Sequence, residues 1–170
     1  MTDKARFAAY GAVKRIFGGA YSNLLTFDKG LTGIDRSFAE SIVLGTLERK
    51  VTLEYIISEY AKKAIKNDVK ALLMTGIYQI LYMDKVPSSA ACDETVEIAK
   101  RIFGKSTAGF INAVLRTISS AKSDLLNKID HEAGYIKYSA DKDLYELIES
   151  QYGDKTERIF GAFFGKAPTY

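Results

Sequence analysis

Only two prolines, Pro87 and Pro168, occur in the 170 residues of this chain. Proline removes a backbone donor and breaks helices, so the long stretches outside these positions are free to be helical. Within those stretches, apolar residues recur three and four positions apart, which is the spacing of one helix face. No segment alternates apolar and polar residues as a half-buried strand does. The sequence therefore predicts an all-α fold, a bundle of helices.

The first predicted helix covers residues 5–17 and carries several basic side chains. Lys4, Lys14 and Arg15 fall on the side opposite its apolar face, with Arg6 at the flank. No acidic residue lies between Lys4 and Phe27 to neutralise these charges. Cations on one helix face can neutralise nucleic-acid phosphates, although a merely solvated face would have the same composition.

The middle of the chain contains further helical segments with recognisable start and stop signals. Residues 20–33 are expected to form a short helix or turn, and Asp35 is expected to cap the helix that follows. A charged break at residues 48–50 separates that helix from the next one. Asn67 or Asp68 is expected to cap a helix that is apolar nearly all round, which predicts a place at the centre of the bundle.

Two more helices complete the predicted core. One begins at Ser88 or Ser89, after Pro87, and the other at Ser106 or Thr107. We therefore predict a helical domain at residues 1–120 and a helical linker or appendage at residues 121–170. The second part has weaker helices, expected near residues 125–129, 141–152 and 156–164.

The chain lacks the motifs that catalysis would need. No glycine-rich turn joins a strand to a helix, so a nucleotide or S-adenosylmethionine site is not expected in this segment. Cys92 has acidic neighbours, which oppose thiolate formation, and we expect it to be a packing residue. The single His131 has no Cys or His cluster around it, so no metal site is expected. Without an apolar run of about 20 residues, the protein is expected to be cytoplasmic.

Six stretches, read together, go beyond a generic helical bundle. They are Ala5-Arg6, DRSFA at 35–39, LGTL at 44–47, LYMDKVP at 81–87, DETVEIAK at 93–100 and GFINAVLR at 109–116. This series resembles the NusB-like N-terminal domain of the RsmB (Sun/Fmu) family, whose members methylate cytosine C5 in small-subunit (16S) rRNA with S-adenosylmethionine. The tail, residues 138–170, is similar to the linker that precedes the methyltransferase domain in that family.

The resemblance implies an RNA-binding segment, without catalytic residues, that brings 16S rRNA to a C-terminal methyltransferase domain of the same parent chain. S-adenosylmethionine would belong to the parent protein and not to this segment. A net charge of +3 permits RNA binding without demanding it. The candidate RNA-binding residues are Lys4, Arg6, Lys14, Arg15, Arg36, Asn112 and Arg116.

Some of these residues have equally good structural explanations. Arg36 follows the expected cap Asp35, where a positive charge opposes the helix dipole, so a salt bridge would explain it as well as RNA would. Asn112 and Arg116 lie four positions apart and share a helix face, where they could form a small polar site. Arg116 would also simply suit the C-terminal end of a helix. The tyrosines could stack on unpaired bases, but helical spacing makes most of them core or boundary residues.

Two other functions fit the same sequence. One is a standalone antitermination module of the NusB type, which would bind RNA together with a ribosomal protein. The other is a helical protein–protein adaptor without an RNA role. The apolar residues Phe160, Phe163 and Phe164 are expected to be exposed and to drive self-association, which gives the hypothesis of a homodimer.

Overall fold

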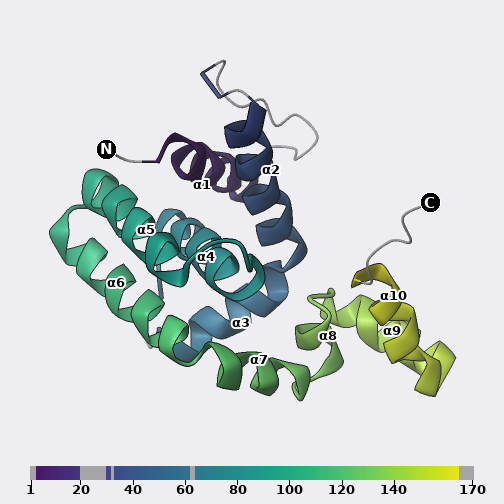
Figure 1. The fold of residues 1–170 in the computed structure, drawn as a ribbon. Helices are drawn as coiled ribbons and strands as arrows, with labels where there is room; N and C mark the ends of the chain where they lie inside the picture. The colour runs from purple at the N-terminus through teal and green to yellow at the C-terminus, as the bar shows by residue number, and fades with distance from the viewer. Residues whose placement is uncertain (1–2, 20–29, 32, 62–63, 165–170) are drawn as a thin grey trace.

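A computed structural model describes residues 3–19, 30–31, 33–61 and 64–164 of the chain, and these residues form helices and no strand (Figure 1). The predicted all-α fold is confirmed. The helices in chain order are α1 (Lys4–Phe17), α2 (Gly33–Glu48), α3 (Lys50–Tyr60), α4 (Asn67–Tyr82), α5 (Ser88–Phe103), α6 (Lys105–Ser120), α7 (Lys122–Asp130), α8 (Gly134–Lys137), α9 (Lys142–Tyr152) and α10 (Thr156–Phe164), with a 3-10 turn, η2, at Gly153–Lys155.

Helix α4 lies at the centre of the bundle, as its apolar sequence predicted. Eleven of its sixteen residues are buried, and it contacts α1, α2, α3, α5, α6 and α7. Leu73, Met74, Ile77 and Ile80 are completely inaccessible to solvent. Because α4 has no face free for water, the other helices must surround it, and α1 is held in place against α4 and α2.

Three of the predicted helix starts were wrong. Helix α2 begins at Gly33, so Asp35 lies inside its first turn, where a carboxylate still suits the helix dipole. Helix α4 begins at Asn67 itself, and no side chain caps it. Helix α6 begins at Lys105 because Gly104, with a φ of 83°, redirects the chain immediately before it. Most of residues 20–33, the expected short helix or turn, lies outside the described residues.

The polypeptide after α6 continues to pack on the bundle. Leu125 and Ile129 of α7 belong to the same buried cluster as the residues of α4. In α3, the Thr52 hydroxyl donates a 2.5 Å hydrogen bond to the carbonyl oxygen of Ile136 in α8. The division at residue 120 stays a prediction, but side-chain packing does not stop there.

The start of α3 is closed by a residue far away in the sequence. Arg49, at the N-cap position of α3, makes no side-chain cap bond. Instead, Ser139 Oγ accepts hydrogen bonds from the backbone N–H groups of Val51 at 3.1 Å and Thr52 at 3.4 Å. Ser139 has a φ of 49°, a conformation that non-glycine residues adopt at a cost. The α8–α9 connection is thereby tied to the bundle.

Helices α9 and α10 form a small unit beside the bundle, at the right of Figure 1. The Phe160 ring lies 4.8 Å from the Tyr145 ring and 6.0 Å from the Tyr138 ring, centroid to centroid. Phe160 is therefore buried, and the expectation that it is exposed was wrong. Phe163 is exposed, as expected, and the side chain of Phe164 lies outside the described residues.

Candidate nucleic-acid interface

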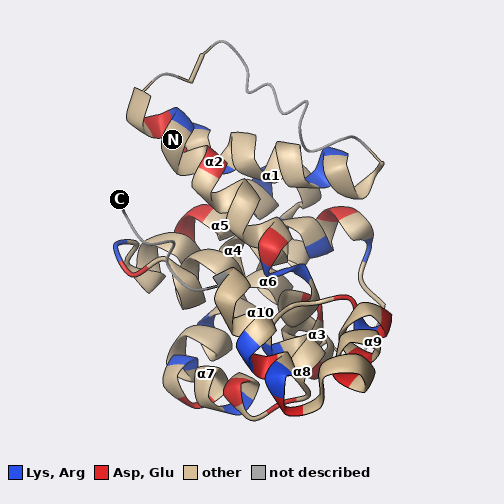
Figure 2. Ribbon diagram, turned by 90° about the vertical axis from the view of Figure 1, so that its right-hand side faces the viewer, with Lys and Arg blue, Asp and Glu red and all other residues tan. Residues whose placement is uncertain are grey.

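Three basic side chains of helix α1 face solvent because its apolar face packs against the bundle. Ala9, Ala12 and Val13 are completely buried against the bundle. Lys4, Lys14 and Arg15 are exposed on the other side, as the sequence predicted. Figure 2 shows α1 and α2 at the top of the molecule, with charges of both signs alternating through α7, α8 and α9 below.

Arg6 is mostly buried, with only 11% of its side chain exposed. Its Nε donates a 2.7 Å hydrogen bond to Gln79 Oε1, and its guanidinium forms an ion pair with Asp3 and lies over the ring of Phe38 at 4.9 Å. These contacts join α1 to α2 and α4. A packing role is established for Arg6, whereas its RNA contact stays a prediction.

Lys14 is paired, although no acidic residue lies near it in the sequence. Its Nζ lies 2.8 Å from Asp68 Oδ2 in the first turn of α4, and this hydrogen bond raises the pKa of Lys14 above its ordinary value. The expectation of an uncompensated basic helix was therefore wrong for Lys14. Lys4 and Arg15 form no ion pair with any described residue.

Arg101 is a further cation on the same surface, and it was not predicted from the sequence. It is exposed in the last turn of α5, and its guanidinium carbon lies 4.9 Å from the centroid of the Phe7 ring in α1. A basic residue at the end of a helix is ordinary, because it suits the dipole. Only the packing of α5 beside α1 shows that Arg101 extends the basic surface of α1, and no local sequence signal reports that packing.

Arg36 is exposed on α2, four residues into the helix. It forms no ion pair with any described residue, so the alternative explanation by a salt bridge has no partner within the part of the chain that the structure describes. Its assignment as an RNA contact stays a prediction.

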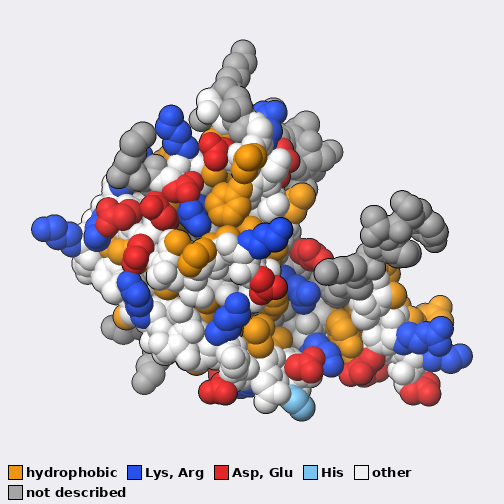
Figure 3. Space-filling model, viewed as in Figure 1, with side chains coloured by type: hydrophobic (Ala, Val, Ile, Leu, Met, Phe, Trp, Pro, Cys, Tyr) orange, Lys and Arg blue, Asp and Glu red, His pale blue; other side chains and the backbone are white. Residues whose placement is uncertain are grey.

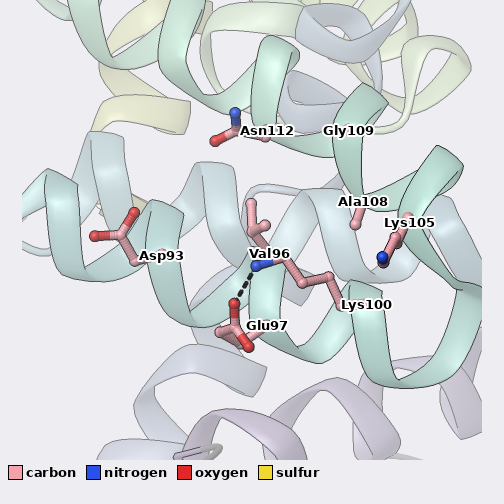
Figure 4. Close-up of a pocket in the computed structure, with 8 residues that line it drawn as sticks. All are labelled: Asp93, Val96, Glu97, Lys100, Lys105, Ala108, Gly109 and Asn112. Carbon is pink, nitrogen blue, oxygen red and sulfur yellow. Dashed lines mark hydrogen bonds and ion pairs between the residues drawn. The ribbon is translucent and has the colours of Figure 1, made fainter.

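Asn112 and Arg116 share one face of α6, as predicted, and Asp93 of α5 joins them. Arg116 Nη2 lies 2.6 Å from Asp93 Oδ1, and Arg116 Nε lies 3.5 Å from Asn112 Oδ1. The groove beside them carries Asp93 and Glu97 as well as two lysines (Figure 4). Because both signs are present, this groove attracts phosphate less than the exposed face of α1 does, and its assignment to RNA stays a prediction.

The single cysteine and the possible metal ligands can be located in the described part of the chain. Cys92 is buried, and burial raises the pKa of its thiol, which keeps the sulfur protonated and confirms a packing role. The described residues contain no group of three or more His, Cys, Asp or Glu side chains placed to hold a metal ion.

None of the described helices is long and apolar enough to cross a bilayer. Charged side chains of both signs mix with hydrophobic ones on the face in Figure 3.

Comparison with known proteins gives the chain a clear set of relatives. A family model described as "NusB family" matches residues 4–120. The "Probable ribosomal RNA small subunit methyltransferase B" of Synechocystis is 30% identical over 140 residues, which cover 79% of this chain and 31% of that protein. The "Ribosomal RNA small subunit methyltransferase B" of Vibrio cholerae is 30% identical over 172 residues, which cover 97% of this chain and 39% of that protein.

A relative of a different kind also matches. The "Transcription antitermination protein NusB" of Ruminiclostridium cellulolyticum is 35% identical over 108 residues, which cover 61% of this chain and 72% of that protein. The chain thus spans about a third of the length of the two methyltransferase relatives and most of the length of the antitermination protein.

Proposed function

The chain belongs to the NusB family, and from this premise we propose that it is the RNA-binding N-terminal domain of an S-adenosylmethionine-dependent methyltransferase acting on cytosine C5 of small-subunit rRNA. In this role it holds rRNA while a methyltransferase domain in the same parent protein performs the reaction. The cofactor and the catalytic residues belong to that other domain, and the protein acts in the cytoplasm.

The extent of the similarity carries the proposal. The match to the methyltransferase of Vibrio cholerae covers 97% of this chain, so it includes helices α7 to α10. The match to the antitermination protein covers only 61%. Leu125 and Ile129 of α7 pack on the bundle and Thr52 bonds to α8, so the part of the match that follows residue 120 begins with helices that belong to the folded bundle.

The RNA-binding surface that we propose is the exposed face of α1 together with the end of α5. Lys4, Arg15 and Arg101 are exposed cations without an acidic partner among the described residues. Lys14 contributes less because Asp68 neutralises it. Cations in this arrangement bind phosphates by releasing counterions, which gives affinity without reading base sequence.

A direct test measures the affinity of this chain for fragments of small-subunit rRNA across a salt series. Lys4→Glu combined with Arg15→Glu should weaken binding and lower the slope of log affinity against log salt by about 1.4, because each phosphate contact to a single strand contributes about 0.7. Lys155→Glu combined with Arg158→Glu is the matched control, since both residues are exposed near α10 and the net charge changes equally. Equal weakening by both pairs, or no salt-dependent binding, would reject the α1 surface.

The second candidate function is a standalone antitermination factor, favoured by the 72% of the Ruminiclostridium cellulolyticum protein that the chain covers. Disruption of the gene separates the two functions. Loss of one 5-methylcytosine from small-subunit rRNA, restored by the intact gene, supports the methyltransferase parent. Unchanged methylation with early termination of rRNA transcription supports the antitermination factor instead.

A further inference from the structure

The end of α5 and the start of α1 form a small shelf made of Phe7 and Arg101. The guanidinium of Arg101 lies over the Phe7 ring, with its central carbon 4.9 Å from the ring centroid, within the range of a cation–π contact. Phe7 is half-buried against the core, so the ring has a fixed position. Arg101 itself is exposed, and its long side chain is held on one side by this ring.

No carboxylate occupies the open side of Arg101. Glu97, one turn earlier on α5, pairs with Lys100. Glu94, two turns earlier, accepts a 3.0 Å hydrogen bond from the backbone N–H of Asp3. Within the described residues, no ion pair of Arg101 is found, so its charge and its planar group remain available.

The shelf stands beside a flat stripe on α1 that has a cation at each end. Lys4, Ala8, Gly11 and Arg15 follow one another at helical spacing. Lys4 and Arg15 are exposed, Ala8 and Gly11 are half-buried, and a Cβ added at Gly11 would meet nothing within 4 Å. Arg15 lies eleven positions after Lys4, a rise of about 16 Å along the helix. Only small side chains lie between them, so a phosphate backbone can approach the helix closely.

We propose that RNA lies along this stripe as a single strand, with phosphates at Lys4 and Arg15 and with one unpaired base stacked on the guanidinium of Arg101. This assignment rests on the proposed RNA-binding function and adds a preference for single strands. Unpaired bases stack on arginine planes as well as on aromatic rings, whereas bases paired inside a duplex have no free face for such a contact.

The test compares two probes that carry the same charge: a short oligoadenylate, and an abasic sugar–phosphate chain of equal length. The intact chain should bind oligoadenylate roughly 5- to 150-fold more tightly than the abasic probe, the range expected for one stacked base. Arg101→Lys keeps the positive charge and loses the plane. It should therefore remove most of this preference while the salt dependence of binding stays unchanged.

Two controls accompany that variant. Arg158→Lys makes the same exchange at an exposed position on α10 and should leave the preference intact. Phe7→Leu removes the ring beneath Arg101 and should reduce the preference, with circular dichroism confirming that the helices persist.

The outcomes separate this inference from the function on which it rests. Equal binding of both probes by the intact chain, or a preference that survives Arg101→Lys, overturns the base-stacking site while RNA binding by α1 stands. An absence of salt-dependent binding to small-subunit rRNA fragments overturns the proposed function itself.

Discussion

Replacement of Ser139 tests whether one hydroxyl holds the α8–α9 connection to the start of α3. Ser139→Ala removes the oxygen that accepts hydrogen bonds from Val51 N–H and Thr52 N–H. Thr52 is completely buried, so water cannot replace the lost acceptor easily. Loss of a helix N-cap costs about 0.5–2 kcal/mol, and we expect a value of about 1 kcal/mol here.

Ser139→Gly removes the same hydroxyl but also relieves the backbone. The φ of 49° at Ser139 lies in the left-handed region, which costs a residue with a Cβ roughly 1–2 kcal/mol and glycine almost nothing. The relief therefore offsets most of the lost cap. We expect the glycine variant to be close to the unmodified chain in stability, and about 1 kcal/mol more stable than the alanine variant.

Thermal and urea unfolding followed by circular dichroism provide the assay, with tyrosine fluorescence as a second probe of two-state behaviour. For a domain of this size, 1 kcal/mol shifts the Tm by roughly 2–4 °C. Ser139→Ala should lower the Tm by that amount, and Ser139→Gly by clearly less. The reasoning is refuted if alanine leaves the Tm unchanged or if glycine is the less stable of the two.

Three further predictions concern single contacts and pH. Gly11→Ala should stabilise the chain by up to about 1 kcal/mol in urea unfolding, because the added methyl meets open space in a helix. Gly45→Ala should destabilise it by roughly 1–3 kcal/mol, because its Cβ would lie 1.9 Å from Tyr78 Cζ. A Gly45→Ala variant more stable than the Gly11→Ala variant would contradict both expectations. Arg6→Met should cost about 1–3 kcal/mol in the same assay by leaving buried Gln79 Oε1 without its donor, and an unchanged midpoint would argue against the packing role. Burial raises the pKa of five tyrosines above 10.0, so the folded state keeps protons that the unfolded state loses. The free energy of unfolding should thus be at its full value below pH 10 and fall as the pH rises through the folded-state pKa values, and a stability independent of pH in that range would refute this. The tyrosines are Tyr10, Tyr55, Tyr78, Tyr82 and Tyr145.

The helices themselves could be predicted because their signals are local. The predicted first helix at residues 5–17 and last helix at residues 156–164 agree with α1 and α10 to within one residue. Apolar spacing along a short segment is enough for this, and it also identified α4 as the central helix. The predicted caps failed at Asp35 and Asn67, because both residues lie within the first turn of α2 and α4, and α4 begins without any capping side chain.

The candidate site could be predicted only in part, because its electrostatics depend on contacts between distant residues. Exposure of Lys4 and Arg15 follows from the helix period of α1. The pairing of Lys14 with Asp68 joins residues 54 positions apart, and the contact of Phe7 with Arg101 joins residues 94 positions apart. No pattern within a helix reports such pairs. The tertiary structure therefore decides which predicted cations stay free and which additional ones join them.

The central position of α4 has a consequence for the newly made chain. Helices α1, α2 and α3 precede α4 in the sequence, whereas its other neighbours, α5, α6 and α7, follow it. At a synthesis rate of about 5–20 residues per second, roughly 2–10 s separate the end of α4 from the end of α7. During that interval the faces of α4 that α5, α6 and α7 cover in the folded chain have no partner. Nascent chains in which α4 has left the ribosome before α5, α6 and α7 should therefore be the ones that depend on a ribosome-associated chaperone.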